Sequence, residues 1–321
     1  VAKDKAKAKL LADREKAFHW VRTQRGKGSI YRTTLFVKLL CLFVNKIASM
    51  DAEGVGIEME ADKPSWYDAL NGLPGLFGSS LPETFELKRL ALVMIQALEE
   101  EGEAVAVPEE LHEFFRKTAG VLTRHILKKG GLKNFDFWNL VSAFKEKYRH
   151  DTAFGVSGAE KTLSAAEIKS FLEHAREKIE IGIQKAFDAK TGLFPTYFEN
   201  TLVRYKRKKS GANTELEPWQ FKQSPLPFFL EGPVHAMKVE KDPQKRKKLL
   251  KAVRESGLYD RKLGMYKVNA DMKKASLEIG RARVFAPGWL ENESVFLHME
   301  YKFLLEMRKA GLYEEFFEDI R

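Results

Sequence analysis

Apolar residues recur at intervals of three and four along most of the chain, a spacing that predicts amphipathic helices. The pattern is strongest over residues 83–101, 108–129, 134–149 and 164–188. The last range opens with Ser164-Ala-Ala-Glu167, a capping box whose two side chains accept hydrogen bonds from backbone N–H groups of the first turn. Further helices are expected after Glu231 to His235 and at 4–23, 31–49, 242–255, 289–310 and 313–321.

The connections between these helices are rich in glycine, proline and aromatic residues, whereas strand signals are few and short. Short extended segments are expected near 54–59 and 259–268, and the run 206–215 is expected to be a surface loop. No repeat of fixed period is visible, which argues against a solenoid. The pattern therefore predicts one all-α domain over residues 1–321. Structured loops at regular intervals suit a closed ring of helical hairpins with a site on one face.

Composition places the chain among ordinary soluble proteins, with 321 residues of which 44% are hydrophobic and 31% charged. Cys41 is the only cysteine, so no intrachain disulfide can form and a cytoplasmic setting is expected. The longest apolar run, 35–44, is too short and too charged to span a bilayer. No signal peptide is visible, and because the chain begins with Val1, we expect a fragment of a longer protein or one subunit of a split one.

The net charge is +10, from 55 Lys and Arg against 45 Asp and Glu, which indicates an anionic partner. The basic runs at 206–209 and 245–248 are interpreted as solvated faces, because no nucleic-acid-binding motif accompanies them. Phosphate-binding glycine loops, dinucleotide fingerprints and metal-ligand spacings are not visible in the sequence. We therefore expect no metal, no cofactor, no nucleic acid and no membrane contact.

The segment 63–80 concentrates glycine, proline and aromatic residues around a single carboxylate, Asp68. Such composition is typical of a loop of fixed shape, and loops held on a rigid scaffold often carry chemistry. Asp68 directly follows Trp66 and Tyr67, so poor hydration would raise its pKa and let it act as a general acid. The alternative is that Asp68 only caps the helix that follows it.

The run from Trp66 to Asn71, Trp-Tyr-Asp-Ala-Leu-Asn, resembles the Trp-Asn-Asp-Cys-Leu-Asn core of glycoside hydrolase family 94, the cellobiose phosphorylase group. The stretch 77–84 is similar to the branch of that family that acts on β-1,2-linked oligoglucans. The resemblance implies that Asp68 is the general acid. It also implies an (α/α)6 toroid, incomplete here on its N-terminal side because family members are longer. A chain carrying the missing part, or a second copy, would then be a partner.

An inverting phosphorylase needs a site for phosphate, which attacks the sugar directly and replaces the second carboxylate of a hydrolase. Side chains able to bind phosphate occur in the regions that correspond to the family's anion site: His235, Lys267, Arg281 and Arg283. Two departures from the family stand beside them. A phosphate-contacting Gln of the family is Val268 here, and a phosphate-binding Thr-Gly pair is Glu291-Asn292.

Oligosaccharides stack on aromatic faces and hydrogen-bond to fixed polar groups. The candidate sugar-binding residues are aromatic or polar side chains in the structured loops: Trp66, Tyr67, Asn71, Tyr197, Trp219, Gln223, Glu231, Trp289 and Glu291. Each aromatic taken singly fits a packed core better than a sugar subsite, whereas their shared placement in structured loops favours subsites for the group.

The prediction is an inverting phosphorylase that cleaves β-linked glucooligosaccharides, with β-1,2 linkage implied by the branch, to give α-glucose 1-phosphate. Two alternatives stay open. Glu291 or Glu293 could act as a general base, which would make the protein a hydrolase or a transglycosylase. The chain could also be a non-catalytic carbohydrate-binding or assembly module.

Overall fold

The computed structural model describes residues 4–14, 19–59, 78–127, 132–211 and 213–321. It divides into two compact units, each built from two stretches of the chain. Unit 1 consists of Val1–Ser49 and Leu90–Lys178, and unit 2 of Met50–Arg89 and Ile179–Arg321. Two long helices, α4 (Leu81–Glu101) and α7 (Ala165–Ala186), contribute residues to both units. The expectation of a single domain stays a prediction.

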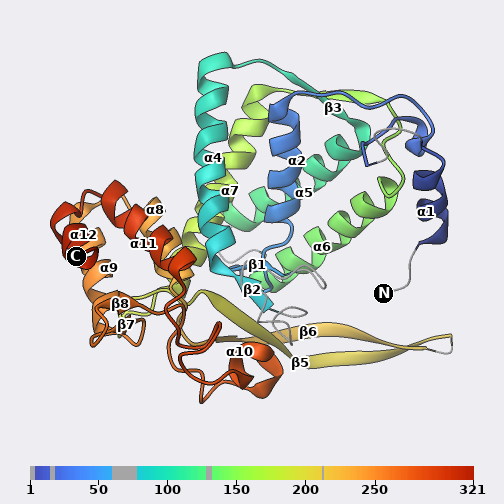
Figure 1. The fold of residues 1–321 in the computed structure, drawn as a ribbon. Helices are drawn as coiled ribbons and strands as arrows, with labels where there is room; N and C mark the ends of the chain where they lie inside the picture. Colours follow the sequence, from blue (N-terminus) through green and yellow to red (C-terminus); the bar gives the residue numbers. More distant parts are fainter. Residues whose placement is uncertain (1–3, 15–18, 60–77, 128–131, 212) are drawn as a thin grey trace. The chain divides into compact units, whose positions relative to one another are not determined.

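Unit 1 is mainly helical and follows the predicted periodicity (Figure 1). Its core includes Phe43, Phe115 and Phe171, with Phe171 meeting Phe43 and Phe115 at ring-centroid distances of 5.9 and 4.9 Å. The elements are α1 (Lys5–Ala12), the 3-10 turn η1 (Gln24–Gly26), α2 (Leu35–Ile47), β3 (Val105–Pro108), α5 (Glu109–Leu127), α6 (Asn134–Asp151) and β4 (Glu160–Leu163). The helix expected over 4–23 is therefore too long, because α1 ends at Ala12.

The predicted capping box at the start of α7 is confirmed. The backbone N–H of Ser164 donates to Glu167 Oε2 at 3.0 Å, and the backbone N–H of Glu167 donates to Ser164 Oγ at 3.3 Å. Each side chain thus satisfies the other residue's backbone donor, as the sequence spacing predicts.

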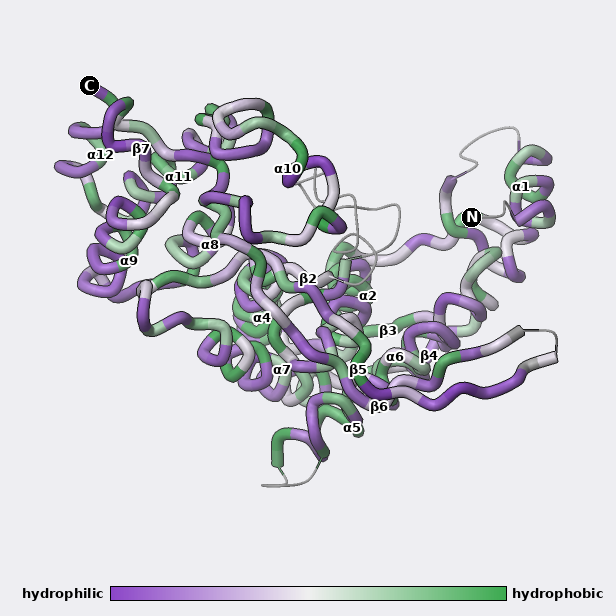
Figure 2. The backbone as a smooth tube through the Cα atoms, turned by 90° about the horizontal axis from the view of Figure 1, so that it is seen from below, coloured by the Kyte–Doolittle hydropathy of each residue, from purple (hydrophilic) through white to green (hydrophobic). Residues whose placement is uncertain are grey.

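Unit 2 contains a four-stranded antiparallel sheet in the order β1-β2-β5-β6. Its strands are β1 (Ile57–Glu58), β2 (Gly78–Ser80), β5 (Tyr197–Ser210) and β6 (Asn213–Pro225). Strand β2 pairs with β5 only over Tyr197 to Glu199, after which β5 and β6 continue as a two-stranded hairpin. Figure 1 shows this hairpin extending beyond β1 and β2, and Figure 2 shows its outer part coloured mainly as hydrophilic.

The all-α prediction, and with it the (α/α)6 toroid, is wrong, since β5 and β6 span 14 and 13 residues. The run 206–215, expected to be a loop, forms the outer part of this hairpin. Alternation of apolar and polar residues is a signal of a half-buried strand. The outer hairpin is largely exposed on both faces, so no such alternation marks it.

The remaining part of unit 2 is helical with two short strands. It comprises α8 (Glu231–Val239), α9 (Pro243–Glu255), β7 (Tyr259–Asp260), β8 (Met265–Tyr266), η2 (Leu277–Ile279), α10 (Arg281–Val284), α11 (Leu297–Lys309) and α12 (Tyr313–Asp319). The helix expected over 289–310 begins only at Leu297. Leu290 and Glu293 have φ angles of 47° and 51°, which place them in a turn instead of a helix.

A buried apolar cluster, hereafter the unit 2 cluster, supports the sheet edge and the loops around it. It is formed by Met59, Tyr197, Leu226, Phe229, Val268, Met272, Ile279 and Ala282. Phe229 lies edge-on to Tyr197, with ring centroids 5.1 Å apart. Among the described helices of both units, none is long and apolar enough to cross a membrane.

Candidate active site

Three residues predicted from separate parts of the sequence meet at the start of α8. The Tyr197 hydroxyl, at the start of β5, donates a hydrogen bond to Glu231 Oε2. His235 lies one turn further along α8, with its Nε2 3.9 Å from Glu231 Oε1. Only 8% of Glu231 is exposed, so this carboxyl is held among protein groups with little access to water.

Close packing of α8 on the start of β5 fixes this arrangement. The Thr196 hydroxyl donates to the Phe229 carbonyl at 2.9 Å and accepts from the Gly232 backbone N–H at 3.1 Å. A Cβ atom at Gly232 would come within 2.5 Å of Thr196 Oγ1, so the contact requires glycine. Glu231 is thereby placed in the first turn of α8, directly beneath the Tyr197 hydroxyl.

The other side of His235 faces Glu86, on the first part of α4. His235 Nδ1 lies 2.8 Å from Glu86 Oε1, and Lys238 Nζ lies 3.2 Å from the same oxygen. Arg89 approaches Glu86 Oε2 at 2.5 Å. His235 therefore lies between two carboxyl groups, of which Glu86 is surrounded by cations and Glu231 is buried.

These surroundings shift the two pKa values in opposite directions. Burial raises the pKa of Glu231, and this effect outweighs the opposing effects of the Tyr197 hydrogen bond and of the His235 and Lys302 charges. Burial also acts to raise the pKa of Glu86, but the His235 hydrogen bond and the Lys238 and His235 charges outweigh it and lower that pKa to about 2. Two such carboxyl groups are suited to different roles, one as a proton donor and one as a fixed anion.

Gln223, on β6, lies in the same sheet as Tyr197, but its side chain contacts a different carboxylate, that of Asp51. Its amide donates to Asp51 Oδ2 at 2.7 Å and to Asn200 Oδ1 at 3.0 Å. Asp51 is 2% exposed and also accepts from the Ser79 hydroxyl at 2.6 Å. Its side chain also accepts from the backbone N–H groups of Glu53, Val55 and Gly56. Gln223 thus helps to hold Asp51, which the sequence analysis did not single out.

Lys267, a predicted phosphate ligand, forms an ion pair with Glu293 at 2.8 Å. Both side chains are largely buried, with 16% and 18% exposed. The Asn269 amide donates to the Glu291 carbonyl at 2.7 Å and its Oδ1 accepts from the Glu293 backbone N–H at 2.7 Å. The loops at 267–269 and 291–294 are therefore joined directly, and Glu293 is neutralised by a cation.

Arg283 stabilises a neighbouring loop through its side chain. It donates to the carbonyls of Ala275 at 3.1 Å and Lys273 at 2.8 Å. Arg281 lies on the same short helix, α10, with its side chain exposed. A phosphate contact by Arg283 would require it to exchange these backbone carbonyls for the anion.

The two described candidate tryptophans are both exposed, Trp219 by 50% and Trp289 by 58%. Trp289 lies edge-on to Phe285 with ring centroids 5.4 Å apart, whereas Trp219 is on β6 in the hairpin. Glu291 is half-buried in the turn that precedes α11. Tyr197, in contrast, is fully buried, so it can reach a ligand only through the groups that it positions.

Asp68, Trp66, Tyr67 and Asn71 lie outside the described residues. The described residues that flank this segment are Met59 and Gly78. Met59 N–H donates to the Gly78 carbonyl at 2.9 Å, and Met59 belongs to the unit 2 cluster with Tyr197 and Val268. Met59 and Gly78 are thus joined next to β5, the strand that begins with Tyr197.

Glu86 and Lys238 were missed because their sequence signals are ordinary. A Glu and a Lys on amphipathic helices usually lie on the solvated face. The spacing of His235 and Lys238 at i and i+3 does place both on one face of α8, which is the only signal of a shared partner. Within the described parts of the chain, no group of three or more His, Cys, Asp or Glu residues could hold a metal ion.

No protein-family model matches this chain, and no curated protein matches it.

Proposed function

We propose that the chain is the catalytic part of an inverting glycoside phosphorylase acting on β-linked glucooligosaccharides, with β-1,2-linked chains as the preferred class. In the proposed step, a phosphate oxygen bonds to the anomeric carbon as the glycosidic C–O bond breaks. Asp68 gives its proton to the departing oxygen. The products are α-glucose 1-phosphate and an oligosaccharide shorter by one residue.

The observation that supports this proposal most strongly is the meeting of separate loops around the unit 2 cluster. Met59, Tyr197, Val268 and Ala282 all belong to that cluster. Each lies in, or next to, a segment that contains predicted acid, sugar-binding or phosphate-binding residues. An acid group and an anion site must face the same sugar for inverting chemistry, so a shared core beneath the described residues of these segments favours the proposal.

Charge around His235 also favours an anion on the Glu231 side. Burial raises the pKa of Glu231, which disfavours negative charge on this carboxyl. His235 and Lys302 both favour negative charge at this carboxyl. We assign His235 a phosphate contact and Glu231 a hydroxyl contact. Roles for Lys267, Arg281 and Arg283 are part of the same proposal, with Glu293 competing for Lys267.

The hydrolase alternative receives less support from the geometry. A general base must be free to accept a proton from water. Glu293 is paired with Lys267, so its carboxylate is already engaged. The single cysteine, Cys41, which is a free thiol, supports action in the cytoplasm. A partner chain or a second copy that completes the site belongs to the proposal as well.

The test is to incubate the protein with β-1,2-glucooligosaccharide, with and without inorganic phosphate, and to follow glucose 1-phosphate by phosphorus NMR. We expect phosphate-dependent product, and a loss of at least about 1,000-fold in Asp68→Asn, in which the proton donor is removed. Asp13→Asn, an exposed aspartate at the end of α1, is the matched control and should retain full activity.

Glucose released at the same rate without phosphate would identify a hydrolase and overturn the proposal. Normal turnover by Asp68→Asn would remove the assigned acid. Binding of the oligosaccharide without any turnover would favour a non-catalytic module.

A further inference from the structure

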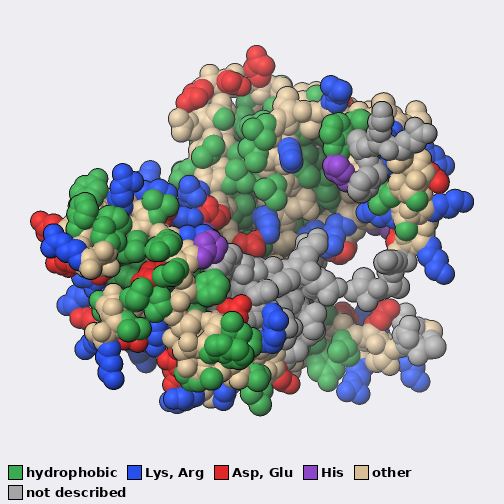
Figure 3. All heavy atoms as spheres, in the orientation of Figure 1, with side chains coloured by type: hydrophobic (Ala, Val, Ile, Leu, Met, Phe, Trp, Pro, Cys, Tyr) green, Lys and Arg blue, Asp and Glu red, His purple; other side chains and the backbone are tan. Residues whose placement is uncertain are grey.

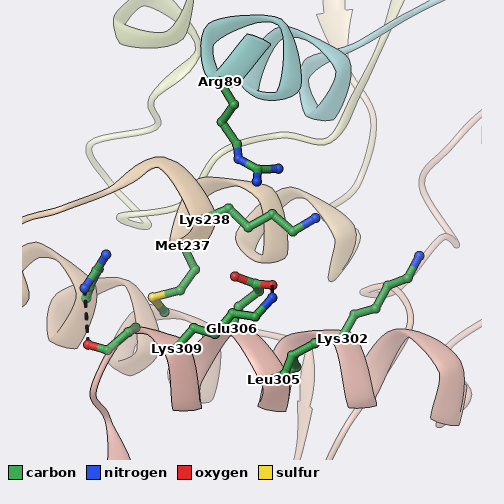
Figure 4. A pocket seen from close by; sticks show the side chains of 9 residues that line it. Arg89, Met237, Lys238, Lys302, Leu305, Glu306 and Lys309 are labelled. Carbon is green, nitrogen blue, oxygen red and sulfur yellow. Dashed lines mark hydrogen bonds and ion pairs between the residues drawn. The ribbon is translucent and has the colours of Figure 1, made fainter. Parts of the chain in front are cut away.

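Unit 2 contains a cavity of about 460 Å³ bordered by α8, α9, α11 and the end of its α4 segment. Its lining is dominated by basic side chains: Arg89, Lys238, Arg246, Lys302 and Lys309. Figure 4 shows Arg89 reaching down from α4 towards Lys238, while Lys302 and Lys309 rise from α11 on the opposite side. The cations therefore approach a shared space from several elements.

Two carboxylates form ion pairs with cations of this lining. Glu306 is the acidic residue of the lining and pairs with Lys309 at 3.0 Å. Glu86, outside the lining, lies 3.2 Å from Lys238 and 2.5 Å from Arg89. The lining itself carries five Lys or Arg side chains and one carboxylate. Figure 3 shows Lys and Arg side chains gathered beside α8 and α9 in this part of unit 2.

Arg246 is held in place by backbone oxygens. Its Nε donates to the Glu240 carbonyl at 2.6 Å and its Nη1 donates to the Ala310 carbonyl at 3.3 Å. Because the guanidinium is oriented before any ligand arrives, less conformational entropy is lost when it binds an anion.

The cavity also has an apolar wall, formed by Met237, Leu305 and Ala310. Phosphate groups carry up to two negative charges and several acceptor oxygens, which suits an array of Arg and Lys donors. A volume of about 460 Å³ also accommodates a small organic body beside the phosphate. An acidic peptide or a nucleic acid would need an extended track, whereas these cations surround one compact space.

We propose that this cavity binds a small phosphate-bearing anion, either inorganic phosphate or the phosphate monoester of a small metabolite. The site is separate from the phosphate site of the proposed reaction, because His235, Lys267, Arg281 and Arg283 do not line it. The two are adjacent through Glu86, which contacts Lys238 of the cavity and His235 of the candidate active site. An anion in the cavity competes with Glu86 for Lys238 and Arg89, and so changes the surroundings of His235.

The experiment is isothermal titration calorimetry on the full chain at low ionic strength, with inorganic phosphate, glucose 6-phosphate and glucose as separate ligands. We expect both phosphate-bearing ligands to bind, with affinity that falls as salt is added, and glucose not to bind. Tighter binding of glucose 6-phosphate identifies a monoester as the ligand. Equal affinities identify the free phosphate ion.

Two variants locate the binding. Lys302→Gln with Lys309→Gln removes two cations and should weaken binding at least about tenfold, or about 1.4 kcal/mol. The single variant Lys302→Gln, which keeps the Glu306 ion pair, should weaken it about threefold. The control Lys247→Gln with Lys251→Gln removes two exposed lysines of α9 outside the lining and should bind normally.

Absence of binding by both phosphate-bearing ligands at about 1 mM would overturn the proposal, as would unchanged affinity in the double lining variant. His235→Gln separates this site from the reaction. It should lose phosphorolysis yet keep anion binding in the cavity, so failure of one proposal is visible without failure of the other.

Discussion

Glu86 and Glu231 lie on opposite sides of His235, and their surroundings shift their pKa values in opposite directions. Glu86 is on α4, 38% exposed and approached by His235, Lys238 and Arg89. Glu231 is on α8, 8% exposed, with the Tyr197 hydroxyl as its donor. The pKa of Glu86 is lowered to about 2 and that of Glu231 is raised.

The comparison shows that burial alone does not decide the charge of a carboxyl group. Desolvation acts to raise both pKa values, and the number of nearby cations decides which effect wins. Around Glu86 several short charged contacts exceed the desolvation effect. Around Glu231 one neutral hydroxyl, a histidine 3.9 Å away and the Lys302 charge do not. A variant that changes the surroundings of only one of these carboxyl groups should therefore shift the pKa of that group and leave the pKa of the other unchanged.

The largest effect is expected from Tyr197→Phe, which removes the hydroxyl that donates to Glu231. A buried carboxyl oxygen left without a donor costs about 1–3 kcal/mol of unfolding free energy. Because that hydrogen bond acts to lower the pKa of Glu231, the variant should raise this pKa further. The destabilisation should thus be greater at about pH 8 than at about pH 5.

Urea denaturation at both pH values measures this effect, with Tyr205→Phe as the control. Tyr205 is also on β5 but is 41% exposed in the outer hairpin, so its loss should change stability by less than about 0.5 kcal/mol. A penalty for Tyr197→Phe no larger than that of the control would show that the hydroxyl does not support Glu231.

A smaller effect is expected from Glu86→Gln. The folded pKa of about 2 lies below the ordinary value of 4.5, so the Glu86 carboxylate stabilises the folded state above pH 4.5. This stabilisation is lost as pH falls through the folded pKa. Because the side chain is 38% exposed, solvent screening reduces the contribution to about 1 kcal/mol.

The stability difference between Glu86→Gln and the wild type should therefore be constant from neutral pH to about pH 5 and shrink at lower pH. Thermal denaturation across that range measures it. Glu103→Gln, an exposed residue that follows α4, is the matched control and should show no such dependence. A difference that grew towards low pH would reverse the assigned charge state of Glu86.

The helices were largely predictable because periodicity and capping are local properties. The Ser164 to Glu167 capping box and the ranges of α4, α5 and α6 follow from residues close together in the chain. The β5–β6 hairpin was not predictable in the same way. Its outer part is charged and exposed on both faces, so the alternation that marks a half-buried strand is missing.

In the candidate site, too, single residues could be predicted from their local sequence, whereas contacts between residues far apart in the chain could not. Tyr197, Glu231 and His235 were each predicted from their own surroundings in sequence, and the structure brings them together. Glu86 was not predictable, because 149 residues separate it from His235 in the chain. The ion pair between Lys267 and Glu293 depends likewise on two loops meeting around the unit 2 cluster.

The opposite pKa shifts on either side of His235 can be measured directly by carboxyl carbon NMR of protein labelled at the glutamate side chains. Glu86→Gln and Glu231→Gln would assign the two signals, each by its disappearance. We predict that the Glu231 signal titrates above the ordinary value of 4.5 and the Glu86 signal well below it. Two signals that titrate together near 4.5, or in the reverse order, would contradict the account.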